Sequence, residues 1–178
     1  NAQLTKLWIP ASVRVIGDDA FVSQELKELT FQDDKEHPSQ LTTIGARAFQ
    51  STTLKTLTLP GSVVTIGYNA FAGMSRLTSI RLGANVGADQ LVAAFVGTSA
   101  LTSIEVDAAN TNYASVDGVL YSKDHSHLIA YPQAKNRGGA YAVVGGVTQI
   151  DDYAFAGATI ATVTLPSSLR TIGEYAFE

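Results

Sequence analysis

The chain has 178 residues, of which 46% are apolar and 16% are charged. An excess of 16 acidic over 12 basic residues gives a net charge of −4, which argues against a nucleic-acid-binding protein because such proteins present a basic face. The absence of cysteine excludes disulfides, thiolate metal ligands and a cysteine nucleophile. No apolar stretch approaches the ~20 residues that span a bilayer, so we expect no direct membrane insertion by this segment.

A short motif recurs along the chain. Ile-Gly, two variable residues and Ala-Phe occur together four times, and a fifth copy has Asp151 in place of the glycine. The five copies occupy residues 16–21, 44–49, 66–71, 150–155 and 172–177. Each copy is preceded by an apolar pattern of the type Leu54-Lys-Thr-Leu-Thr-Leu59. The chain is therefore predicted to form a single repeat array over residues 1–178, with repeats that begin near residues 4, 26, 54, 77, 101, 138 and 160.

Two repeats are longer than the others. The second contains a polar loop within residues 32–40, and the fifth is interrupted by an excursion over residues 107–137. Inside this excursion the dipeptide Asp117-Gly118, flanked by apolar segments, predicts a tight β-hairpin turn. A third apolar segment ends at Pro132, which cannot extend a ladder, so we expect a short three-stranded meander.

Each repeat changes period halfway along. The Leu-x-Leu part alternates like a half-buried strand, so successive strands are expected to stack in parallel in a right-handed solenoid. In the second part, Ile66 and Ala70 are four residues apart, which predicts a short helical turn that aims both residues and Phe71 inward. Gly67 is expected to reverse the chain through a positive φ. We expect the repeated phenylalanines to form one aromatic spine of Phe21, Phe49, Phe71, Phe155 and Phe177.

This pattern resembles the BspA-like, or Treponema pallidum-type, leucine-rich repeats. The resemblance covers the whole chain, including Asp117-Gly-Val-Leu-Tyr121 and Leu128-Ile-Ala-Tyr-Pro132, which look like the hairpin insertion of that family. It implies an α/β repeat fold, namely a leucine-rich-repeat solenoid with a parallel β-sheet on the concave face, short helical turns opposite and a β-hairpin insertion. It also implies a secreted or cell-surface bacterial protein with a role in adhesion.

The exposed side of the predicted sheet is the candidate binding surface. Seven strands in register would form a strip roughly 29 Å long. Its candidate binding residues are Lys6, Trp8, Glu28, Thr30, Thr56, Thr58, Ser79, Arg81, Ser103, Glu105, Thr162 and Thr164. Trp8 is the strongest anchor because tryptophan is enriched at interface hot spots. Lys6 is expected to face Glu28 on the adjacent strand. Arg81 is likewise expected to face Glu105, so these charges could also pair along the sheet without any ligand.

Histidines and paired carboxylates offer little for metal binding or catalysis. His125 and His127 are two residues apart, but the only further ligands nearby are Asp117 and Asp124, so a solvated hairpin tip is the favoured interpretation. The pairs 18–19 and 151–152 are acidic and precede Ala-Phe, where they are expected to favour the start of a helical turn. The sequence contains no nucleophile elbow, phosphate-binding glycine loop or His-Glu-x-x-His motif, so we predict no enzyme, no metal site and no cofactor.

The sequence therefore predicts a non-catalytic protein-binding module, extracellular or on a cell surface, whose partner on the concave face is a protein such as an extracellular matrix protein. One alternative is a structural spacer in a larger surface protein. A second is a carbohydrate-binding accessory module, for which Trp8 and three hairpin residues, Tyr113, Tyr121 and Tyr131, supply aromatic rings. Neither end of the array looks capped, so we expect a segment of a longer array.

Overall fold

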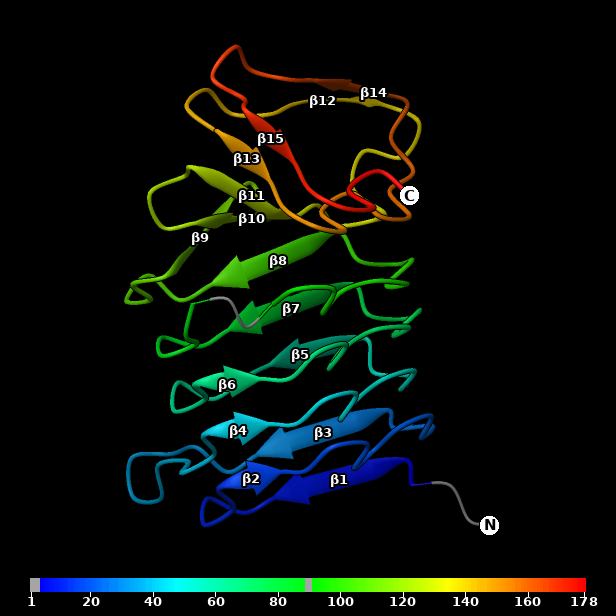
Figure 1. The fold of residues 1–178 in the computed structure, drawn as a ribbon. Coiled ribbons are helices and arrows are strands. Elements are labelled where there is room, and N and C mark those ends of the chain that lie inside the picture. The colour runs from blue at the N-terminus through cyan, green and yellow to red at the C-terminus, as the bar shows by residue number, and fades with distance from the viewer. Residues whose placement is uncertain (1–3, 89–90) are drawn as a thin grey trace.

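A computed structural model describes residues 4–88 and 91–178. These residues wind into a β-solenoid of stacked coils, with the two termini at opposite ends (Figure 1). Each regular coil has three sides, which we name the strand face, the short-strand side and the turn side.

The strand face is formed by the longer strands. In most of them inward apolar side chains alternate with exposed ones, as in the buried Leu57 between the exposed Thr56 and Thr58. The seven strands are β1 (Lys6–Ile9), β3 (Glu28–Phe31), β5 (Thr56–Thr58), β7 (Ser79–Leu82), β8 (Ser103–Val106), β12 (Ala140–Ala142) and β14 (Thr162–Thr164). Where they pair with one another they are parallel, which confirms the predicted stacking.

The short-strand side holds the isoleucine of the repeated motif. Two-residue strands stack in parallel there and bury residues such as Ile44 and Ile66 in the core. They are β2 (Val15–Ile16), β4 (Thr43–Ile44), β6 (Thr65–Ile66), β13 (Gln149–Ile150) and β15 (Thr171–Ile172). These strands were not predicted, although four of the five have β-branched residues at both positions, which favour β-structure.

The turn side contains no helix in the described part of the chain, so the predicted helical turns, and with them the α/β class, are wrong. Successive backbone amides bond in different directions. Gln50 N–H donates to Arg47 O (3.1 Å) in its own coil, whereas Phe49 N–H donates to Ala70 O (2.9 Å) in the next coil. A helix would keep both hydrogen bonds inside its own segment. Here every second amide is used to hold the neighbouring coil.

The chain reverses at a different residue from the one expected. Positive φ angles occur at the residue before Ala-Phe, as at Arg47 (54°) and Asn69 (57°), and not at Gly67. The glycines serve a different purpose, because a Cβ atom built on Gly45 would lie 2.5 Å from the backbone nitrogen of Asp18 in the preceding coil. The Ile-Gly glycine therefore permits close stacking of coils.

The excursion forms the predicted meander of β9 (Tyr113–Val116), β10 (Val119–Ser122) and β11 (His127–Ala130). Both residues of the first turn, Asp117 and Gly118, have positive φ, as expected of a tight hairpin. Strand β11 then pairs in parallel with β13, with Leu128 beside Ile150. The insertion thus ends in a strand that replaces an ordinary short strand of the array (Figure 1).

Strand β10 lies between two hydrophobic cores. Leu120 packs into the first core, which contains Phe71, whereas Val119 and Tyr121 pack into the second core with Phe155. The hairpin is therefore a buried partition between the two cores and does not project from the solenoid.

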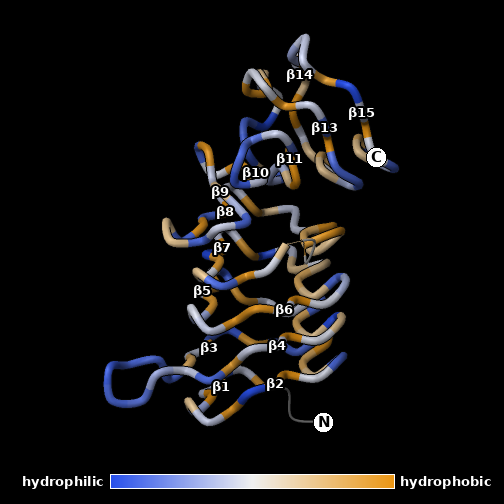
Figure 2. Tube along the Cα trace, turned by 60° about the vertical axis from the view of Figure 1, so that its left-hand side comes forward, coloured by the Kyte–Doolittle hydropathy of each residue, from blue (hydrophilic) through white to orange (hydrophobic). Residues whose placement is uncertain are grey.

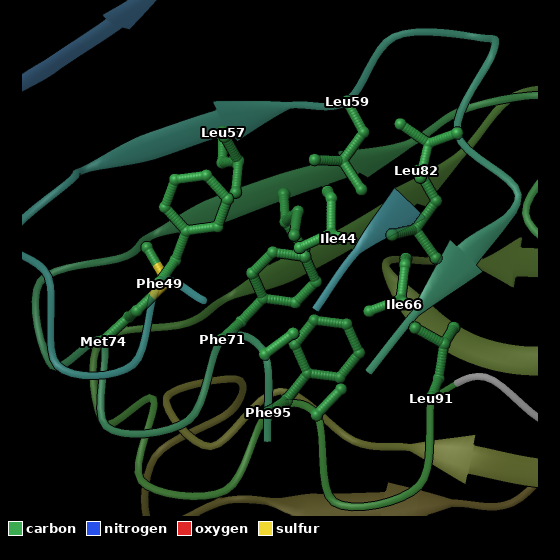
Figure 3. Close-up of a cluster of buried hydrophobic side chains, with 14 of the residues drawn as sticks. Ile44, Phe49, Leu57, Leu59, Ile66, Phe71, Met74, Leu82, Leu91 and Phe95 are labelled. Atoms are coloured by element: carbon green, nitrogen blue, oxygen red, sulfur yellow. The ribbon is translucent and has the colours of Figure 1, made fainter. Parts of the chain in front are cut away.

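The aromatic spine is correspondingly divided. The first ring stack comprises Phe21, Phe49, Phe71 and Phe95, with centroids 5.4–6.3 Å apart. Figure 3 shows the last three of these rings. The second ring stack comprises Tyr131, Phe155 and Phe177, with centroids 4.9–5.0 Å apart. The prediction of one spine is wrong, because Tyr131 starts a second stack. Its N–H donates to Ala154 O (2.7 Å), the same kind of bond that Phe49 makes with its next coil.

Candidate binding surface

The predicted binding residues lie together on the strand face. Ten of the twelve are exposed, and the other two, Ser79 and Ser103, are partly buried. Trp8 has 57% of its surface exposed and is in register with Thr30 of β3. The outward positions of β12, Ala140 and Ala142, continue the set with small side chains. That these residues contact a partner stays a prediction.

The two basic side chains among the predicted binding residues, Lys6 and Arg81, both form ion pairs. Lys6 Nζ lies 2.9 Å from Glu28 Oε1, which confirms that expected pair. Arg81 faces Glu105 in the register of β7 and β8, as expected, but its guanidinium forms an ion pair of 3.1 Å with Asp107 Oδ2 beyond the end of β8. Both pairs are well exposed, so each contributes at most about 1 kcal/mol to stability.

The strip is not continuous. Its strands fall into three groups, β1–β3, β5–β7–β8 and β12–β14, so the expected uninterrupted sheet is wrong. The first break is an open hollow of about 390 Å³ between β3 and β5, at residues such as Thr30, Asp33 and Thr58. The second break, between β8 and β12, contains a hollow of about 410 Å³ beside the hairpin tip.

The hairpin tip covers the free edge of β8. Ile104 N–H donates to Gly118 O (2.8 Å), and Ser115 Oγ donates to Ile104 O (2.6 Å). Asp117, at the tip, forms an ion pair of 3.0 Å with the mostly buried Lys135. This second break is therefore already occupied by part of the chain.

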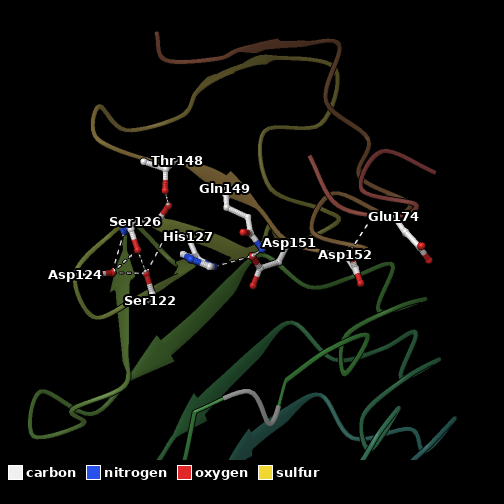
Figure 4. Close-up of polar contacts among 9 residues, drawn as sticks. All are labelled: Ser122, Asp124, Ser126, His127, Thr148, Gln149, Asp151, Asp152 and Glu174. Atoms are coloured by element: carbon white, nitrogen blue, oxygen red, sulfur yellow. Dashed lines mark hydrogen bonds and ion pairs between the residues drawn. The ribbon is translucent and has the colours of Figure 1, made fainter. Parts of the chain in front are cut away.

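A polar cluster joins the hairpin to the following coil (Figure 4). His127 Nδ1 lies 3.0 Å from Asp151 Oδ1, and Gln149 Nε2 donates to the same oxygen (3.0 Å). Burial raises the pKa of Asp151, and His127 partly offsets this effect. Asp151 occupies the glycine position of the motif. A side chain fits at this position because the preceding coil contributes the hairpin strand β11 there. In the other coils, the preceding coil has a tight turn at the corresponding place.

The serines near His127 belong to a separate closed network. Asp124 accepts hydrogen bonds from Ser122 Oγ (2.7 Å) and from both N–H and Oγ of Ser126, and these bonds lower its pKa. Ser122 Oγ also accepts the backbone N–H of His127 (2.9 Å). The hydroxyl is therefore directed to Asp124 and is not presented to the imidazole as a nucleophile would be.

The two histidines of the hairpin lie in different environments. His125 is exposed at the loop after β10, as expected, and has a positive φ of 60°. His127 is the first residue of β11 and is half-buried, so of the two histidines only His125 lies in a solvated loop. In the part of the chain that the structure describes, no three histidine, aspartate or glutamate side chains gather as a metal site.

The acidic pairs have a structural role that differs from the expected one. Asp18 Oδ1 accepts the N–H of Ala46 (2.7 Å), and Asp152 Oδ1 accepts the N–H of Glu174 (2.7 Å). In each case the carboxylate holds the next coil, because no helix is present whose N-terminus it could favour.

The hairpin tyrosines are not available to a ligand. Tyr113, Tyr121 and Tyr131 are at most 3% exposed. The Tyr121 hydroxyl lies 2.5 Å from that of Tyr141, inside the second core. These three aromatic rings therefore cannot contact a carbohydrate, and the carbohydrate-binding alternative is left with Trp8 among the residues proposed for it.

The stacked coils and their exposed strand face define a leucine-rich-repeat protein built as a β-solenoid. The model of the BspA type leucine rich repeat region matches six copies, in residues 1–116 and 142–178, so the chain belongs to this family. The unmatched residues contain most of the hairpin. No curated protein matches the chain. Across residues 4–88 and 91–178, no helix is long and apolar enough to cross a membrane.

Three solved bacterial structures are similar to the chain. A leucine-rich repeat protein from Eubacterium ventriosum is 28% identical over 98% of this chain and 45% of its own, with a TM-score of 0.85. The pneumococcal vaccine antigen PcpA is 28% identical over 97% of this chain and 48% of its own, with a TM-score of 0.69. A leucine rich cell surface protein from Faecalibacterium prausnitzii is 27% identical over 98% and 58%, with a TM-score of 0.52. The chain thus spans less than two thirds of each of these proteins.

Proposed function

We propose that this segment is a non-catalytic protein-binding module, secreted or held on a bacterial cell surface, that binds a partner protein on its strand face. The observation that carries the proposal is the exposure of Trp8, at 57%, on a strand face whose other outward residues are small or polar. Support for the location comes from the similar proteins described as a cell surface protein and a vaccine antigen. Adhesion to an extracellular matrix protein is the specific role we propose.

The second candidate is a spacer that holds another part of a larger surface protein away from the cell. The observation that favours it is the pairing of Lys6 with Glu28 and of Arg81 with Asp107, which leaves few unpaired charges for a partner. A spacer tolerates substitutions on the strand face, whereas a binding module does not.

The two candidates are separated by biolayer interferometry of the monomeric chain against fibronectin and fibrinogen. The test variant is Trp8→Ala with Thr58→Lys, which removes the anchor and adds a charge to the same face. The matched control is Tyr68→Ala, because Tyr68 is 54% exposed on the turn side. We expect saturable binding that the double variant weakens at least tenfold and the control retains. Binding lost equally in both variants, or absent from the unaltered chain, would reject these ligands for the strand face.

A further inference from the structure

The first break in the strand face, between β3 and β5, differs from every other contact between regular coils. We call this opening the slot. The same two coils remain joined on the other sides, because β4 pairs with β6 and Phe49 N–H donates to Ala70 O (2.9 Å). The wider spacing of β3 and β5 is visible in Figure 1. The polar loop that follows β3 projects away from the solenoid beside it (Figure 2). The coils are thus closed on two sides and open on the third.

Backbone groups line one wall of the slot without a partner. In β3, Glu28 N–H donates to Thr5 O (3.2 Å) and Gln32 N–H to Ile9 O (2.9 Å), so the even-numbered residues face β1. The groups of Leu29 and Phe31 therefore point the other way, into the slot. In the described part of the chain, β3 pairs only with β1, so no strand bonds to the edge that Leu29 and Phe31 present to the slot.

The opposite wall has the same character. In β5, Lys55 O accepts from Thr78 N (2.8 Å) and Leu59 N–H donates to Arg81 O (3.0 Å), so the odd-numbered residues face β7. The backbone groups of Thr56 and Thr58 therefore point into the slot, and in the described part of the chain β5 pairs only with β7 on its other edge. Two parallel strand edges with free donors and acceptors therefore face each other. Such edges are templates for an added strand.

The lining fits the two faces of an added strand. The slot encloses about 390 Å³ and is bounded toward the core by Leu29, Phe31 and Leu59. Thr30 and Thr58 border it on the solvent side. An extended segment with an apolar side chain at every second position would bury those side chains and keep the others in water.

We propose that the slot binds an extended segment of a partner polypeptide as an additional β-strand between β3 and β5. This inference rests on the proposed protein-binding function and specifies its mode. Main-chain hydrogen bonds to both walls supply affinity, and the apolar floor selects alternating apolar side chains. Each backbone group that bonds to the added strand exchanges a hydrogen bond with water for one within the sheet. The added strand also closes the interruption in the sheet.

The test uses a synthetic peptide that copies residues 75–84, Ser-Arg-Leu-Thr-Ser-Ile-Arg-Leu-Gly-Ala. This segment contains β7, which pairs in parallel with the other edge of β5, so its side-chain pattern suits a neighbour of β5. Amide exchange of the ¹⁵N-labelled chain is followed by NMR with and without the peptide. The control peptide has the same side chains but is N-methylated at alternate residues, so it cannot complete a ladder.

We expect the amides of Leu29, Phe31, Thr56 and Thr58 to exchange quickly in the free chain and at least tenfold more slowly with the peptide. The N-methylated peptide should produce no protection. The proposal is overturned if these amides are already protected in the free chain, if the peptide gives no protection, or if both peptides act alike. If one of these results is obtained while the chain still binds fibronectin or fibrinogen, strand addition in the slot is rejected and the proposed protein-binding function is retained.

Discussion

The two ring stacks take most of their rings from the same motif but differ in how well those rings are covered. In the first stack, Phe49 and Phe71 have no exposed surface. In the second, Phe155 is 2% exposed whereas Phe177 is 48% exposed. The comparison shows that the phenylalanine of the motif does not contribute equally to the free energy of unfolding in every copy. A ring contributes fully only where a coil lies on each side of it.

The largest effect is expected for Phe71→Ala. Phe71 is stacked between Phe49 and Phe95, so the substitution should lower the free energy of unfolding by about 3–5 kcal/mol. Phe177→Ala is the matched variant in the second stack and should cost no more than ~1.5 kcal/mol, because about half of the ring is already in water. Urea unfolding of both variants measures the difference. Equal losses would show that the two stacks do not differ as described.

A smaller effect is expected from the glycines that set the coil spacing. Gly45→Ala places a methyl group against the backbone of Asp18 and should cost about 1–3 kcal/mol. Gly17→Ala is the control, because nothing lies within 4 Å of a Cβ built at Gly17. Thermal unfolding compares the two variants. The spacing argument is wrong if Gly17→Ala is the more damaging substitution.

The smallest effect concerns two carboxylates near the partition between the stacks. The folded-state pKa of Asp124 is lowered, so its stabilising contribution is present above the ordinary carboxyl pKa and is lost as the pH falls. The pKa of Asp151 is raised by burial, so its contribution is present below the ordinary carboxyl pKa and is lost as the pH rises through the raised value.

Melting temperatures between pH 2 and pH 8 test these opposite signs. The difference between the unaltered chain and Asp124→Asn should shrink as the pH falls. The corresponding difference for Asp151→Asn should shrink as the pH rises. Parallel pH dependence in the two variants would contradict the assigned environments.

Features with local signals were predicted correctly from the sequence. The strands follow from the alternation of apolar residues, and the hairpin follows from Asp117-Gly118 between apolar segments. The Lys6–Glu28 pair followed from the register of adjacent strands, which the repeat itself defines. Each of these features depends on short-range order or on one strand and its immediate neighbour.

Features that depend on choices between coils were missed. The spacing of Ile66, Ala70 and Phe71 suits a helical turn. The chain forms turns instead, because alternate backbone amides donate their hydrogen bonds to the next coil. Arg81 has carboxylates at both Glu105 and Asp107 within reach, and the sequence does not decide between them. The broken strip was likewise missed, because equal apolar patterns in two strands do not guarantee that their edges meet.

The slot also has a mechanical consequence. Hydrogen bonds between coils run along the solenoid axis, so a force that pulls the two ends apart loads them directly, one junction after another. The strands of the strand face pair at the other junctions between regular coils, but at the slot this pairing is missing and the junction is held only by β4–β6 and the turn side. Under tension, the array should begin to extend between β3 and β5, and a strand bound there would raise the force needed to extend it.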